Sequence, residues 1–286
     1  MQGTTVRRAG LVVAVATALT GVAACTSPDS SDGPGQKEDR AAHRRSLAAL
    51  RSAERATERA ESARVESTTT MGALMSMTAD GTLGWSDGVT GTLTITYTGG
   101  TMADTMRRLG TTSMEARYLP DAYYARMGAK FAEQTGGKHW IRYAYNDLGA
   151  LTGGSGSHLG DRMRSTTPNQ SVKLLLSSGD VRKVGQETVR GRSATHWSGT
   201  VTAADIADAG LRKQLTEAGV TTETVDIWVD QRNLLVKKVE KARMTTGLMT
   251  QTAHYADYGV AVRAERPPES DTGDFEDLMR KRTGKP

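Results

Sequence analysis

The sequence has 286 residues, of which 37 are Lys or Arg and 32 are Asp or Glu, giving a formal charge of +5. This small excess forms no concentrated basic stripe, which argues against a nucleic-acid-binding protein. The length suffices for one sizeable domain, and the single cysteine excludes an intramolecular disulfide framework.

The N-terminus predicts an exported precursor. Two arginines, Arg7 and Arg8, precede an apolar run over 11–24. At about 14 residues the run is shorter than the roughly 20 that a membrane-spanning helix needs. It ends in small residues directly before Cys25, as in the lipobox of lipoprotein precursors. We therefore expect residues 1–24 to be removed as a signal peptide and Cys25 to carry lipid. The alternative is ordinary cleavage, with Cys25 left as a free thiol.

Lipidation explains why Cys25 has no disulfide partner. A diacylglyceryl group supplies two acyl chains, which is enough for stable anchoring. Without the two leader arginines the charge falls to about +3, a value that suits a surface near anionic headgroups. The predicted location is extracytoplasmic, on the outer face of the cell membrane.

Composition divides the remaining chain into three parts. Residues 25–39 are rich in Ser, Pro and Gly and predict a flexible tether. Residues 40–268 form the expected domain, which opens with a helix over 41–64 that carries a narrow stripe of alanines. Residues 269–286 predict a charged tail with a loose helix over 274–280.

Beyond the first helix the hydrophobic period changes to two, which predicts antiparallel strands with one apolar face. The expected strands cover 71–79, 92–98, 114–118, 122–127, 140–145, 181–189, 194–201, 224–230, 234–244, 249–258 and 260–264. A Gly/Ser break spans 152–160. Thr167, with Pro168 and Gln170, predicts a capping box at the start of a short helix to about Ser177. Thr202 opens another short helix that ends near Gly219. This order predicts an α+β domain with an antiparallel sheet.

Several ordered segments resemble the LolA/LppX-type lipoproteins, in particular the LppX/LprG-like lipoproteins of actinobacteria. The segments are 123–124, 138–141, 184–191, 195–201, 225–230 and 255–259, followed by Pro267-Pro268. The resemblance covers roughly residues 40–270. It implies a curved antiparallel half-β-barrel wrapped over the N-terminal helix and short helices. It also implies an apolar cavity that binds or carries acyl chains, lipids or lipoproteins, with no catalytic residue.

The alternating strands and the narrow alanine stripe together predict where such a cavity lies. Small residues on the helix and flexible methionines on the strands leave space between helix and sheet. The 12 methionines, against 2 phenylalanines, fit an adaptable apolar lining as well as plain core filling. The expected lining residues are Met75, Met77, Leu93, Ile95, Tyr97, Met114, Tyr118, Met127 and Trp140.

One motif suggests enzyme chemistry. Gly84-Trp85-Ser86-Asp87-Gly88 matches the G-x-S-x-G pattern of serine hydrolases, but it lies between two expected strands with no helix after it. A hairpin turn is the better interpretation. No histidine has a metal-ligand spacing, and no dinucleotide or phosphate-binding loop is present. We expect His196 to be a half-buried sheet residue, and Asp226 and Asp230 to face solvent. The sequence therefore predicts a non-enzymatic protein without metal or cofactor.

Three functions remain open from the sequence. The favoured one is a membrane-anchored protein that binds a lipid or an acyl chain. The second is a non-enzymatic sensor or interaction module that binds another envelope protein. The third is a hydrolase using Ser86, which requires a histidine and an acid within hydrogen-bond reach of that hydroxyl.

Overall fold

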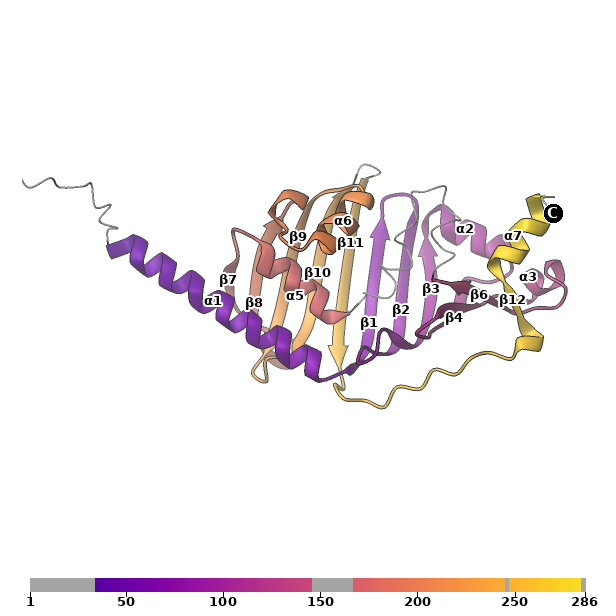
Figure 1. Cartoon of the computed structure of the whole chain (residues 1–286), viewed down its shortest axis with the longest axis horizontal. Coiled ribbons are helices and arrows are strands. Elements are labelled where there is room, and N and C mark those ends of the chain that lie inside the picture. Colours follow the sequence, from indigo (N-terminus) through magenta and orange to yellow (C-terminus); the bar gives the residue numbers. More distant parts are fainter. Residues whose placement is uncertain (1–33, 146–166, 245–246, 284–286) are drawn as a thin grey trace, which may run out of the picture.

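The computed structural model describes residues 34–145, 167–244 and 247–283. These residues form a single curved, open sheet of 12 strands, with helices packed against it (Figure 1). The strand order is β12-β6-β5-β4-β3-β2-β1-β11-β10-β9-β8-β7, and every pairing is antiparallel except β12 with β6. This confirms the expected α+β class with an antiparallel sheet.

The strands run through both halves of the chain. They are β1 Ser62–Met71, β2 Met75–Gly84, β3 Thr90–Gly99, β4 Ser113–Tyr118, β5 Ala122–Arg126, β6 Trp140–Ala144, β7 Arg182–Val189, β8 Arg192–Val201, β9 Val220–Asp230, β10 Leu235–Met244, β11 Gly247–Ala256 and β12 Thr272–Asp274. The helices are α1 Pro34–Arg59, α2 Gly100–Arg108, α3 Ala129–Gln134, α5 Pro168–Ser177, α6 Ala209–Glu217 and α7 Phe275–Thr283.

Helix α1 packs against α5 and crosses the half of the sheet that contains β7 to β11 (Figure 1). Its buried stripe consists of Ser46, Leu50, Ala53 and Thr57, spaced by three and four residues as one helix face requires. The backbone N–H of Leu235 donates to Thr57 Oγ1 at 3.2 Å, which ties the helix to the start of β10. The helix begins and ends earlier than the 41–64 expected from the sequence. Its first turn lies inside the predicted tether, and residues 62–64 belong to β1.

The expected strand over 71–79 is wrong, because a hairpin turn divides it. Gly72 adopts a φ of 48°, a left-handed conformation that favours glycine, and the chain reverses before β2. Met71 therefore lies opposite Met75 across the hairpin rather than ahead of it on one strand. The methionine spacing gave the right period but could not show that the chain turns back.

The C-terminal segment is part of the sheet, whereas the sequence predicted a separate tail. Strand β12 adds to β6 in parallel, and Arg142 bonds Asp274 at 2.8 Å. The ring of Phe275, the first residue of α7, lies 4.7 Å from that of Tyr143. These contacts close the edge of the sheet at β6, and α7 confirms the helix expected there.

Other differences from the expected elements are local. Residues 260–264 form no strand, and α2 and α3 were not predicted. Helix α5 begins at Pro168 as expected, but Thr167 makes no side-chain cap. A capping box forms instead at Thr202, whose hydroxyl and backbone N–H both bond Asp205.

The core lies on the face of the sheet that the helices cover, called here the inner face. Alternate residues of the strands fill it, for example Leu93 and Ile95 of β3 and Val225 and Ile227 of β9. The opposite, outer face is mostly polar and carries two small apolar clusters. One surrounds Trp228 and the other surrounds Tyr124.

Candidate functional site

The inner face over β2 to β5 gathers most of the expected lining residues. Leu93, Ile95 and Met114 are buried there in one cluster. Cross-strand pairing positions them, because Ile95 lies opposite Met114 and Leu93 opposite Ala116. Four expected residues pack against this cluster while only partly buried: Met77, Tyr97, Tyr118 and Met127.

Two expected lining residues lie elsewhere. Trp140 is on the outer face, buried against Ala122 and Tyr124, and Arg117 lies over its ring at 4.5 Å. The expectation that it lines a space between helix and sheet is therefore wrong. The error arose because alternation alone does not fix which face of a short strand is covered. Met75 is half-buried at the β1–β2 hairpin, outside the cluster.

A row of aromatic rings continues the inner face toward α7. The rings of Tyr118 and Tyr123 are 5.1 Å apart, and Tyr123 lies 5.7 Å from Tyr143. Burial raises the pKa of Tyr118 and Tyr123, and it raises that of Tyr143 to about 12. These hydroxyls therefore remain neutral at physiological pH and suit an apolar surface with a few polar atoms.

A buried ion pair lies on the same inner face, in the half of the sheet that α5 covers. Lys238 Nζ donates to Glu240 Oε2 at 2.9 Å, and Ser171 of α5 donates to Glu240 Oε1 at 2.5 Å. Burial by itself lowers the pKa of Lys238, but Glu240, Tyr255 and Glu223 outweigh it, so the net pKa is raised. Lys238 is therefore charged, and it lies with two carboxylates inside the fold.

Two residues before Ser171, α5 carries a second unusual polar group. Asn169 is 4% exposed, and its side-chain oxygen has no hydrogen-bond partner among the described residues. A buried acceptor without a donor is costly and is rare in native proteins. Sequence reasoning missed both features. The only signal in the sequence was that Lys238, Glu240 and the buried Ala242 are spaced by two and therefore share one face of β10. The pairing of β10 with β9 shifts in register between Leu235 and Lys237, so the face could not be assigned from the start of the strand.

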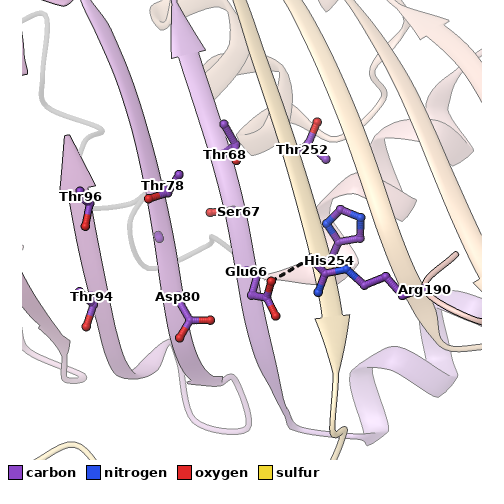
Figure 2. A pocket seen from close by; sticks show the side chains of 11 residues that line it. Glu66, Ser67, Thr68, Thr78, Asp80, Thr94, Thr96, Arg190, Thr252 and His254 are labelled. Carbon is purple, nitrogen blue, oxygen red and sulfur yellow. Dashed lines mark hydrogen bonds and ion pairs between the residues drawn. The ribbon is translucent and has the colours of Figure 1, made fainter. Parts of the chain in front are cut away.

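The outer face has a hollow of about 480 Å³ over β3, β2, β1 and β11 (Figure 2). Threonines of these strands line it, together with Asp80 and His254. Figure 2 shows Arg190 passing beside His254 toward Glu66, which it bonds at 2.8 Å. This bond is the main cause that lowers the pKa of Glu66. The hollow is lined mainly by hydroxyls and charged side chains, so it is a less suitable surface for an acyl chain than the inner face.

His196 lies on the outer face between two carboxylates. Its Nδ1 is 2.8 Å from Glu187, and its Nε2 is 2.9 Å from Asp226. Its ring stacks on Trp228 at 4.1 Å, and the indole N–H bonds Glu187. The prediction of a half-buried sheet histidine is confirmed. Asp226 binds this histidine rather than only facing solvent, and Asp230 bonds backbone N–H groups of the β9–β10 turn.

The hydrolase hypothesis requires a histidine at Ser86, and none lines the hollow there among the described residues. The shallow hollow at this serine is lined by Arg55, Glu58, Arg59, Glu61 and Trp85, with no histidine. In the part of the chain that the structure describes, no group of three His, Cys, Asp or Glu residues is placed to hold a metal ion. No described helix combines the length and the apolar composition needed to cross a membrane. Cys25 lies outside the described residues.

Comparison with known proteins identifies close relatives in Streptomyces. The chain is 57% identical over 296 aligned positions, covering 98% of both chains, to the "Putative lipoprotein SCO4650" of Streptomyces coelicolor. The chain belongs to this lipoprotein family. A further member is an uncharacterized 31.2 kDa protein of Streptomyces griseus, 51% identical over 82% of this chain and 80% of that protein. No family model matches the sequence.

Solved structures with a similar arrangement come from other bacteria. Lipoprotein LppX of Mycobacterium tuberculosis is 16% identical, with a TM-score of 0.49 over 77% of this chain and 98% of LppX. LprF of Mycobacterium bovis is 13% identical, with a TM-score of 0.49 over 78% of this chain and 97% of LprF. A LolA superfamily protein of Nitrosomonas europaea is 9% identical, with a TM-score of 0.24 over 77% of this chain and 96% of that protein.

Proposed function

We propose that this member of the lipoprotein family is anchored through Cys25 on the outer face of the cell membrane. There it binds the acyl chain of a lipid or another amphiphile between the inner face of the sheet and the helices. The N-terminal pattern before Cys25 and the naming of the Streptomyces coelicolor relative as a lipoprotein support the anchor.

The observation that carries the ligand proposal is the composition of the inner face. Met77 and Met127 are only partly buried and pack against the cluster that contains Leu93, Ile95 and Met114. Methionine adapts to apolar partners of different shape, so such a surface can accept chains of varied length. Each methylene that leaves water contributes about 0.8 kcal/mol. Binding therefore needs no catalytic group.

The buried polar groups under α5 complete the proposed site. Lys238 and Glu240 lie on the same inner face as the apolar cluster, and Asn169, whose oxygen has no partner among the described residues, is buried on the covering helix α5. An amphiphile has one apolar part and one polar part, and the inner face offers surfaces for both. The polar end of the ligand would satisfy groups whose burial is otherwise unfavourable.

The test uses three neighbouring positions on β3. Leu93 and Ile95 face inward and are buried, whereas Thr94 between them is exposed on the outer face. Leu93→Arg and Ile95→Arg should abolish uptake of a fluorescent fatty acid analogue, because a buried unpaired charge costs several kcal/mol. Thr94→Arg should take up the analogue as the wild type does. Circular dichroism must show that all three variants fold.

Mass spectrometry of the purified protein under native conditions gives a second, independent readout. We expect a population carrying an amphiphile that organic solvent extracts. Absence of any such ligand, together with no uptake of the analogue by the wild type, would contradict the proposal. Ser86→Ala should leave uptake unchanged. An esterase activity in the wild type that this substitution removes would favour the hydrolase instead.

A further inference from the structure

Exposed apolar side chains gather at one place in the described part of the chain. Only four large hydrophobic residues there are exposed: Leu74, Met102, Val184 and Leu248. Three of them belong to the β1–β2 hairpin, the start of α2 and the start of β11, elements that lie together at the end of the sheet away from the α1–β1 connection (Figure 1). The N–H of Met102 donates to the Leu74 carbonyl at 3.0 Å, and the N–H of Gly72 donates to the Leu248 carbonyl at 3.3 Å.

Methionines extend this group toward the interior. Met249, Met71 and Met75 lie in register on β11, β1 and β2, and all three are half-buried. We call these six residues the apolar rim: Met71, Leu74, Met75, Met102, Leu248 and Met249. Met75 continues the inner face, because it is followed on β2 by Met77 of the apolar cluster, whereas Leu248 lies on the opposite face with Arg243, at the same end of the sheet. An exposed apolar patch of this kind marks an interaction surface.

The charges around the rim identify its partner. Arg243 lies directly opposite Leu248 across the β10–β11 hairpin, and Lys241 is on the same strand. Arg107 and Arg108 end α2, the helix that carries Met102. All four cations are exposed; Arg107 pairs with Asp104, and the other three form no ion pair among the described residues. Leucine and methionine bordered by unpaired cations match the interface of an anionic bilayer.

We propose that the apolar rim inserts into the headgroup region of an anionic membrane, with Lys241, Arg243 and Arg108 on the lipid phosphates. This goes beyond the proposed function, since rim contact requires no bound ligand. The chain between Cys25 and Pro34 spans at most about 30 Å, so an anchored domain stays within reach of the bilayer. Contact at the rim would place the inner face directly over the acyl chains.

The experiment places a single reporter at the rim. Cys25 is the only cysteine, so in the anchored protein Leu248→Cys supplies the one free thiol for an environment-sensitive nitrobenzoxadiazole dye. Val184→Cys is the matched control, because the two side chains are 53% and 51% exposed and Val184 lies on β7, at the far edge of the sheet. Both variants are reconstituted in phosphatidylcholine vesicles with and without phosphatidylglycerol.

We expect the dye at 248 to shift to the blue and to be quenched by brominated acyl chains on phosphatidylglycerol vesicles, while the dye at 184 stays in water. Lys241→Glu with Arg243→Glu should remove the dependence on phosphatidylglycerol. Arg192→Glu, an exposed cation of β8, should preserve it. A dye at 248 that stays in water on anionic vesicles overturns the proposal. So does a dye at 248 that is already buried without vesicles, which would indicate a second copy of the chain.

Flotation separates this proposal from that of the anchor. Wild-type protein that does not float with vesicles at high salt contradicts the lipid anchor. The dye at 248 is then measured on the chain that also carries Cys25→Ser, added to anionic vesicles at low salt, where a blue shift still supports the rim and its absence still rejects it.

Discussion

Lys238 and Glu240 form an ion pair in the interior, with 2.9 Å between Nζ and Oε2, although both project from the same strand two residues apart. Their side chains are 8% and 9% exposed. Charges buried this deeply stabilise a fold only while each retains its partner.

The first prediction follows from this pair. Glu240→Leu leaves Lys238 charged and poorly paired, so the free energy of unfolding should fall by about 3–5 kcal/mol. Lys238→Met combined with Glu240→Leu should recover most of that loss. Urea denaturation measures both. As a control, Asp80→Asn in the exposed Arg64–Asp80 pair should change the value by less than about 1 kcal/mol. A double variant no more stable than Glu240→Leu would contradict the interpretation.

The second prediction concerns alkaline pH. Burial raises the folded-state pKa of Tyr118, Tyr123 and Tyr143, so the unfolded chain loses these protons first. The contribution of these protonated hydroxyls to the free energy of unfolding is complete below pH 10. It is lost as the pH rises toward about 12, the folded-state pKa of Tyr143. The melting temperature should therefore decline in this window, and Tyr143→Phe should make the decline shallower. An equally steep decline in the variant would show that other groups dominate.

The third prediction concerns the close approach of β2 and β3. A Cβ atom on Gly81 would lie 2.1 Å from the carbonyl oxygen of Thr92, so the backbone must shift to accept one. Gly81→Ala should destabilise the protein by about 1–3 kcal/mol in urea denaturation. Gly185→Ala is the matched control, because Gly185 is also in a strand and has no atom within 4 Å of the added Cβ. Gly185→Ala should leave the free energy of unfolding nearly unchanged. An equal loss of stability in both variants would disprove the steric cause.

The fourth prediction tests the anchor. Cys25→Ser removes the only thiol available for acylation. The protein should then appear in the medium or accumulate as an uncut precursor, as seen by fractionation and mass spectrometry. Unchanged membrane retention of a processed Cys25→Ser protein would rule out lipidation at this residue.

The sequence predicted most of the fold because periodicity reports local burial. Helix α5 was placed correctly, since Pro168 can occupy only the first turn. The hairpin at Gly72 was missed because Met71, before the turn, and Met75 and Met77, after it, keep the even spacing of a single strand. Strand β12 was missed because its three residues have no hydrophobic alternation and depend on pairing with β6.

The site was predicted less completely than the fold. The apolar residues of β3 and β4 were found because each lies on a strand with a clear apolar face. Trp140 was assigned to the wrong face, since both faces of β6 carry large side chains. Lys238 was missed because nothing in a charged side chain indicates burial. Only the covering helix α5 and the partner Glu240 explain it.

The junction of β1 with β11 determines when this protein can fold. Ser62 donates a hydrogen bond to the carbonyl of Val260, 198 positions later, and β1 pairs with β11 over its length. One half of the sheet can therefore form early, but the two halves join only after the last strands have been synthesised. Contacts of such long range are formed slowly. Until then the free edge of β1 is open to pairing with other chains, so correct folding depends on completing the synthesis of this chain before it meets them.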